Sequence, residues 1–153
     1  YLAFARGEGE EKMEFTNLTA LLEEVVAAAR RSGAWVTLHG TPDLELPLRP
    51  DAIRRAITNL VDNARRIAPH VAIGIVSLSS NTVEVTVDDD GPGIPPERLE
   101  TVFRPFESGG ASGGQGHGLG LTIARDIIRA HGGEIVLSQS PLGGLRASIR
   151  LPV

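Results

Sequence analysis

A chain of 153 residues with 41% hydrophobic and 22% charged residues is long enough for one domain with its own core, which excludes a dominant disordered region. The net charge of -4 and the lack of a basic stripe argue against a nucleic-acid partner, and the absence of cysteine excludes disulfides and cysteine-based metal sites. No apolar stretch approaches the roughly 20 residues that a membrane-spanning helix needs, so we expect no membrane contact by this domain.

The amino-terminal half predicts two amphipathic helices and three short strands. Asn17 precedes a run of Leu and Val at helical spacing and is a good helix cap, and Gly33 ends that helix. The predicted elements are, in order, a polar linker over 1–12, a strand starting at Phe15, a helix over 18–32, strands over 35–39 and 44–48, and a helix from Pro50 to about Ile67.

The carboxy-terminal half predicts further strands and a third main helix. Its elements are strands over 71–78 and 82–87, a short helix over 95–102, a mobile loop over 107–116, a helix from about Gly118 to Ala130, and strands over 134–138 and 146–151 with a Gly-Gly turn between them. Strands and helices do not alternate regularly. This order predicts an α/β two-layer sandwich, with three main helices on one face of a mixed, largely antiparallel sheet.

The second predicted helix carries Asn59 and Asn63, whose spacing of four residues places both carboxamides on one face. A carboxamide oxygen is a neutral hard ligand suited to Mg²⁺, which proteins usually hold with few side chains plus phosphates and water. Arg66, nearly one turn after Asn63, is in reach of a phosphate. Taken alone, the pattern is equally consistent with two surface asparagines on an amphipathic helix.

Segment 88–95, Asp-Asp-Asp-Gly-Pro-Gly-Ile-Pro, directly follows a predicted strand and contains the pattern Asp89-x-Gly91-x-Gly93. A carboxylate at a strand end accepts a hydrogen bond from an exocyclic amine such as that of adenine, and the glycines let the turn fold under a flat ring. The spacing does not match the calcium loop of an EF-hand. By itself, a turn without function is the simpler interpretation.

Phe103 and Phe106 bracket a proline in segment 102–106, Val-Phe-Arg-Pro-Phe. We expect the two rings to anchor the front of the mobile loop in the core. For this segment alone, a packing role is the simpler interpretation, and ligand contact is the alternative.

Segment 114–121, Gly-Gln-Gly-His-Gly-Leu-Gly-Leu, opens the last predicted helix. Glycines allow backbone N–H groups to turn toward an anion, and a helix N-terminus adds partial positive charge. The segment is neither a Walker A loop, because no Gly-Lys-Ser/Thr follows, nor a Rossmann loop, because it comes late in the chain. It therefore indicates a phosphate cradle, with a flexible hinge as the alternative.

These four segments, in this order, resemble the ATP-binding domain of sensor histidine kinases, in the superfamily that includes type II topoisomerases, heat-shock chaperone ATPases and mismatch-repair ATPases. The resemblance covers Phe15 to Pro152, and four weak motifs in order are specific together. The opening Tyr-Leu, the Asp-Asp-Gly-Pro-Gly-Ile turn and the closing Leu-Pro-Val are similar to EnvZ-like osmosensor kinases. The resemblance implies a Bergerat-type fold and a protein-histidine kinase domain that uses ATP and Mg²⁺.

The resemblance also implies a role for each matching position. Asp89 would hold the adenine amino group, and Asn63 would coordinate Mg²⁺ with support from Asn59. Arg66 would contact phosphate or ribose. The remaining nucleotide-binding candidates form the purine pocket and the loop over the triphosphate: Gly91, Gly93, Ile94, Phe106, Gln115, Gly116, His117, Gly118, Leu119 and Gly120. Two departures stand out: Ile67 occupies a position where related kinases commonly have an aromatic, and residues 107–121 contain no Lys or Arg.

The sequence around each histidine indicates whether it is a phosphoacceptor. None of His39, His70, His117 and His131 is followed by the acidic residue and polar or basic pair of a phosphoacceptor site. The resemblance therefore implies that residues 1–12 link this catalytic domain, 13–153, to a separate dimerisation and phosphoacceptor domain of a homodimeric kinase. A response regulator would act downstream, and the domain would lie in the cytoplasm below an inner-membrane-anchored receptor.

Two other classes of function remain open from the sequence. The first is a stand-alone ATPase or a serine kinase of the anti-sigma-factor type, since such proteins resemble this chain in fold. Those relatives place a Glu at the position of Asn59, where it acts as a general base. A nucleotide-binding regulatory module without turnover is the third class. The complete set of motifs argues against it, and the lack of basic residues over 107–121 keeps it open.

Overall fold

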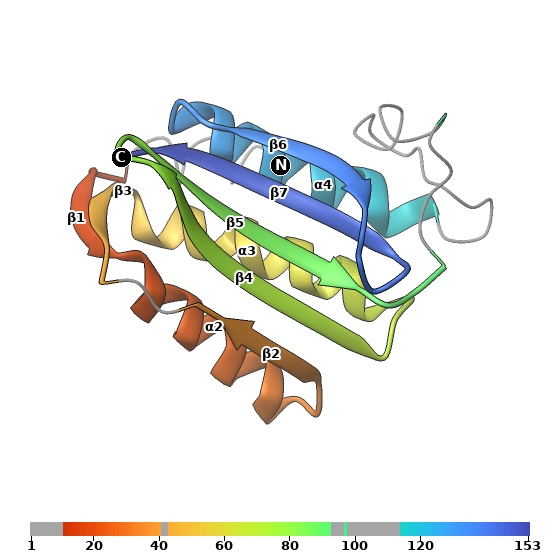
Figure 1. Ribbon diagram of the computed structural model, residues 1–153. Coiled ribbons are helices and arrows are strands. Elements are labelled where there is room, and N and C mark those ends of the chain that lie inside the picture. The colour runs from red at the N-terminus through yellow and green to blue at the C-terminus, as the bar shows by residue number, and fades with distance from the viewer. Residues whose placement is uncertain (1–10, 41–42, 93–96, 98–113) are drawn as a thin grey trace.

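A computed structural model describes residues 11–40, 43–92, 97 and 114–153, and the structural statements below concern these residues (Figure 1). Its elements follow the predicted order. They are β1 (Glu14–Asn17), α2 (Leu18–Arg31), β2 (Trp35–His39), β3 (Glu45–Leu48), α3 (Pro50–Arg65), β4 (His70–Ser79), β5 (Thr82–Asp89), α4 (Gly114–Ala130), β6 (Glu134–Gln139) and β7 (Leu145–Pro152).

The main sheet has five strands in the order β2-β4-β5-β7-β6, and β1 pairs with β3 in a separate two-stranded sheet. Only β2 and β4 are parallel in the main sheet, and the other neighbours are antiparallel. Figure 1 shows α2, α3 and α4 along one face of this sheet. The predicted two-layer α/β sandwich with a mixed, largely antiparallel sheet is therefore confirmed.

The core lies between the sheet and the helices, because each contributes one apolar face. Alternate residues of β5 such as Val83, Val85 and Val87 point toward the helices and are buried. On α3 the matching stripe includes Ile53 and Ile57. Burial of this common face fixes which side of each strand points toward the helices, because a slip of one residue would turn every side chain over.

The predicted limits of the first helix are confirmed. The side chain of Asn17 accepts a hydrogen bond from the backbone N–H of Ala20 at 2.9 Å, so Asn17 caps α2. Gly33 has a φ of 93°, a left-handed conformation that glycine adopts without strain, and the helix ends before it.

Other limits differ from the prediction. Helix α3 ends at Arg65 and not near Ile67, since Pro69 disfavours helical backbone in the residue before it. Helix α4 begins at Gly114, so the prediction of a loop through residue 116 is wrong. Each glycine costs about 1 kcal/mol in a helix relative to alanine, but that preference is weak beside the packing of the rest of α4. The helix predicted over 95–102 and the loop over 107–113 lie outside the described residues, apart from Glu97.

Several elements end or begin at one edge of the sandwich. The carboxyl ends of β5 and α3, the amino end of α4 and the turn between β6 and β7 gather at the right of Figure 1. The amino end of α3 and the carboxyl end of α4 lie at the opposite edge (Figure 1). None of the helices within the described part of the chain has the length and apolar character needed to cross a membrane.

Candidate functional site

The strand pleat separates the three consecutive aspartates that the sequence places at the end of β5. Asp88 points to the open face of the sheet, where Arg146 binds its two oxygens at 2.7 and 2.9 Å. Asp90 accepts a hydrogen bond from the backbone N–H of His70 at 3.1 Å. Asp89, between them, is buried with 2% of its surface exposed. Of the three, Asp89 is therefore the carboxylate directed toward the helix layer.

Two backbone groups fix the orientation of the Asp89 carboxylate. Its Oδ1 accepts hydrogen bonds from the backbone N–H of Gly91 at 3.0 Å and of Leu145 at 3.1 Å. Among the described residues, none donates to Oδ2. Within the described part of the chain, the carboxylate is thus held through Oδ1 alone.

Burial raises the pKa of Asp89, and the negative charges of Asp90 and Asp88 act in the same direction. The hydrogen bonds from Gly91 and Leu145 act against this rise, because they stabilise the ionised form. A buried carboxylate with a raised pKa is typical of a functional group, since such burial costs stability unless a partner compensates it.

Two glycines allow the backbone to approach Asp89 closely. A Cβ at Gly144, in the turn between β6 and β7, would overlap Oδ1 of Asp89 and lie 2.6 Å from its carbonyl oxygen. A Cβ at Gly91 would lie 2.9 Å from the carbonyl oxygen of Ile67, just after α3. Gly144 was not among the predicted site residues. Its signal in the sequence is the Gly143-Gly144 pair, which by itself predicts only a turn.

Helix α3 presents its two asparagines on one stripe, at helical spacing from Ala52 and Ala56. Asn63 is 8% exposed and Asn59 is half-buried. Neither carboxamide forms a hydrogen bond with another described residue. The stripe therefore changes from small apolar residues near the start of α3 to carboxamides near its end.

The basic residues at the end of α3 differ in their contacts. Arg65 lies 3.8 Å from Asp62, one turn earlier on the same helix. Arg66 is the C-cap residue and is exposed, with no ion pair to another described residue. Ile67 is 37% exposed, next to the backbone that Gly91 approaches. Among the described residues, Arg66 is thus a guanidinium at this edge that is exposed and without an ion pair.

The remaining predicted site residues are only partly described. Gly93, Ile94 and Phe106 lie outside the described residues. Segment 115–119, which contains Gln115, Gly116, His117, Gly118 and Leu119, forms backbone of α4 near its amino end. Gly120 is half-buried, and a Cβ there would meet no described atom within 4 Å. The nucleotide-binding roles of all these residues stay predictions.

The donor chemistry of this edge is compatible with Mg²⁺ bound together with phosphates. Within the described ranges, no three His, Cys, Asp or Glu side chains gather as a metal-binding group. A metal here would need oxygen ligands from a bound molecule in addition to Asn63, which is how proteins usually hold Mg²⁺. A groove of about 470 Å³ lined by Leu78, Gly132 and Pro152 lies at the opposite end of the sheet and contains none of the candidate residues.

Comparison with known proteins places this geometry in a family. The family of histidine kinase-, DNA gyrase B- and HSP90-like ATPases matches residues 48–153. The sensor histidine kinase GtrS of Pseudomonas aeruginosa is 40% identical over 143 residues, which cover 93% of this chain and 29% of GtrS. CpxA of Escherichia coli, an EnvZ-like sensor histidine kinase, is 38% identical over 145 residues, which cover 87% of this chain and 30% of CpxA.

A solved structure agrees with the sequence relatives. The ATP binding domain of PrrB from Mycobacterium tuberculosis superposes with a TM-score of 0.78 at 30% identity, covering 92% of this chain and 97% of that domain. The chain belongs to the family of histidine kinase-, DNA gyrase B- and HSP90-like ATPases, and its relatives are sensor histidine kinases. The predicted family is confirmed, and the chain spans about 30% of the length of these curated relatives.

Proposed function

We propose that this chain is the catalytic domain of a sensor histidine kinase, which binds Mg-ATP and transfers the γ-phosphoryl group to a histidine of a dimerisation and phosphoacceptor domain. The observation that carries the proposal is Asp89, a buried carboxylate whose Oδ2 accepts from none of the described residues. The exocyclic amine of adenine is the donor that this oxygen would accept. The sensor histidine kinases among its relatives support the same conclusion.

The chain's residues would bind and orient the nucleotide. Asp89 would fix the base, Gly91 would leave room for the flat ring, and Arg66 would bind phosphate. Asn63, supported by Asn59, would provide the protein ligand of Mg²⁺, and the metal would neutralise charge on the phosphates. Phosphoryl transfer depends mainly on such positioning and charge neutralisation, so the domain needs no covalent intermediate of its own.

The amide at position 59 favours phosphoryl transfer over hydrolysis. A carboxamide does not take a proton as a general base, so Asn59 cannot activate water or a serine hydroxyl. The nearest carboxylate on α3, Asp62, is exposed and lies 3.8 Å from Arg65. A histidine imidazole is already nucleophilic and does not need that base.

The phosphoacceptor domain would belong to the same kinase, joined upstream in a homodimer, and a response regulator would receive the phosphoryl group next. The sensor kinases that the chain resembles are about three times its length, which supports additional domains. The domain would lie on the cytoplasmic side of an inner membrane that anchors its receptor. The proposal includes neither a nucleic-acid partner nor membrane contact by this domain.

Calorimetric titration of the chain with ATP, ADP and GTP, each with and without Mg²⁺, tests the nucleotide part of this proposal. We expect ATP and ADP to bind, with a contribution from Mg²⁺, and GTP to bind much more weakly. Equal affinity for ATP and GTP would contradict the role of Asp89.

A further inference from the structure

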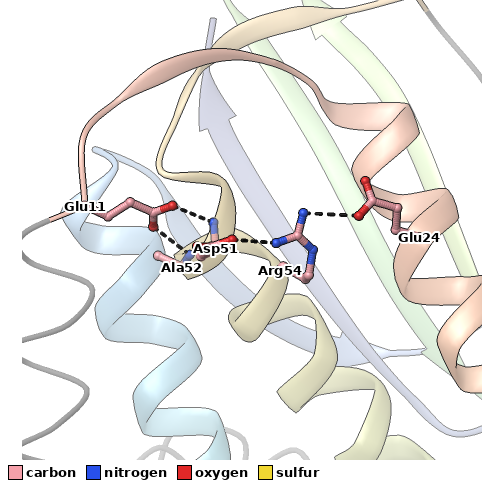
Figure 2. Close-up of polar contacts among 5 residues, drawn as sticks. All are labelled: Glu11, Glu24, Asp51, Ala52 and Arg54. Atoms are coloured by element: carbon pink, nitrogen blue, oxygen red, sulfur yellow. Dashed lines mark hydrogen bonds and ion pairs between the residues drawn. The ribbon is translucent and has the colours of Figure 1, made fainter.

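The amino end of α3 does not cap itself. Its N-cap residue, Arg49, makes no side-chain cap bond, and Pro50 at the first helical position has no N–H. The next two backbone N–H groups belong to Asp51 and Ala52. They donate to Glu11, to Oε2 at 2.8 Å and to Oε1 at 3.0 Å (Figure 2). Glu11 therefore satisfies the donors that an N-cap side chain normally satisfies, from 40 residues away.

Glu11 is held by its backbone as well as by its carboxylate. The Nε of Arg49 donates to the carbonyl oxygen of Glu11 at 2.8 Å. The negative carboxylate also lies at the positive end of the α3 dipole, where an anion is stabilised. Glu11 is thus attached to Arg49 and the first turn of α3 by three hydrogen bonds.

The other helices meet α3 at the same place. The imidazole of His131, at the end of α4, accepts from the backbone N–H of Arg49 at 3.0 Å and donates from Nδ1 to the carbonyl of Ile127 at 2.8 Å. Figure 2 shows Arg54 between Asp51, at 2.7 Å, and Glu24 of α2, at 3.2 Å. Asp51 is therefore directed toward Arg54, and its carboxylate does not replace Glu11 as the cap.

The capped turn lies on the same stripe as the candidate metal ligand. Ala52, whose N–H Glu11 binds, is eleven residues before Asn63, which corresponds to about 16 Å along a helix. A helix transmits a shift of its first turn along its axis as a rigid element. We propose that Glu11 is a positioning residue. Its cap holds α3 in place, so that the contact of Glu11 with the first turn of α3 determines the position of Asn63 relative to Mg-ATP. The second half of this statement rests on the proposed function.

Three variants test the cap directly. Glu11→Ala should speed hydrogen exchange at the amides of Asp51 and Ala52 about fivefold, the usual effect of losing a cap. Glu11→Gln has a single acceptor oxygen, so only one of the two amides should speed up. Glu14→Ala is the matched control, because Glu14 is exposed, carries the same charge, and its side chain has no hydrogen bond or ion pair with a described residue of α3. Unchanged exchange at both amides in Glu11→Ala would overturn the cap.

The link to the nucleotide is tested with the same proteins. Glu11→Ala should raise the Kd for Mg-ATP about threefold or more, with Glu14→Ala unchanged. Adding Arg49→Ser gives α3 a local cap and should restore both the exchange rates and the Kd. Faster exchange with an unchanged Kd would show that Glu11 only stabilises the domain and would overturn the positioning role.

Restored exchange rates without a restored Kd would show that Glu11 affects nucleotide binding other than through the cap. This result would also overturn the positioning role. If the unaltered chain does not bind Mg-ATP, the proposed function fails, and the cap itself is still judged by the exchange rates.

Discussion

Replacement of Asp89 by asparagine should separate ligand binding from folding. The backbone N–H groups of Gly91 and Leu145 both donate to Oδ1. An asparagine at this position must therefore place its carboxamide oxygen there, since the amide nitrogen cannot accept. The NH₂ group then occupies the place of Oδ2 and meets the exocyclic amine of adenine as donor against donor.

The loss of affinity follows from the interaction that is removed. A hydrogen bond to a charged buried group is worth about 1–3 kcal/mol, so Asp89→Asn should weaken ATP binding by about 5- to 150-fold. GTP presents a carbonyl where ATP presents the amine, and a carbonyl accepts from NH₂. The ratio of the affinities for ATP and GTP should therefore fall by a larger factor than the affinity for ATP itself.

The Asp89→Asn substitution should weaken ATP binding without lowering the stability of the domain. Burial raises the pKa of Asp89 above 3.8, so between pH 3.8 and the folded pKa the native state binds more protons than the unfolded state. Stability consequently decreases as the pH rises across that interval, and the ionised carboxylate destabilises the ligand-free domain at neutral pH. Asparagine has no charge to bury and keeps both backbone hydrogen bonds.

Calorimetric titration and thermal unfolding of the same protein samples test both parts. We expect Asp89→Asn to have a melting temperature equal to or above that of the unaltered domain and a strongly reduced affinity for ATP. Unchanged ATP affinity, or a collapse of the fold that accounts for lost binding, would refute the reasoning.

Three further changes test the site and its surroundings. Asn63→Ala should weaken Mg²⁺-dependent ATP binding by about tenfold and leave metal-free binding nearly unchanged, and an unaltered Mg²⁺ dependence would make Asn63 a structural residue. Gly144→Ala should lower ATP affinity, since the new Cβ would overlap Oδ1 of Asp89. An unchanged Kd in a titration would show that the turn moves to accommodate the Cβ without displacing Asp89. Burial lowers the pKa of His131 below 6.5, so the unfolded chain gains a proton first as the pH falls. Denaturant unfolding should therefore show stability that is constant near neutral pH and declines below about pH 6.5, less steeply in His131→Gln.

Local sequence patterns were sufficient where the structure depends on near neighbours. Asn17 caps α2 through an N–H three residues away, and Gly33 ends that helix through its own φ. The burial of alternate residues on β5 and of one face on α3 likewise follows from periodicity. The fold class could therefore be predicted from composition, spacing and the order of the motifs.

Contacts between distant residues were not predictable in this way. The hydrogen bond from Leu145 to Asp89 spans 56 residues, and the cap from Glu11 to Asp51 spans 40. Nothing in the neighbourhood of Gly144 or Glu11 in the sequence indicates its partner, so the sequence suggested only a turn and a polar linker. The helical start of α4 was not predictable from local propensity either, because the packing of the rest of the helix outweighs the low helix propensity of its glycines.

The central claim, phosphoryl transfer to histidine, is tested most directly by incubating the chain with γ-labelled ATP, with and without the dimeric phosphoacceptor domain of a related kinase. Alone, the chain should gain almost no stable label and hydrolyse ATP slowly, because Asn59 provides no base for water. With the partner and Mg²⁺, the label should appear on the partner's histidine as an acid-labile, base-stable phosphoramidate. Acid-stable label on a serine, or rapid ATP hydrolysis by the chain alone, would contradict this account.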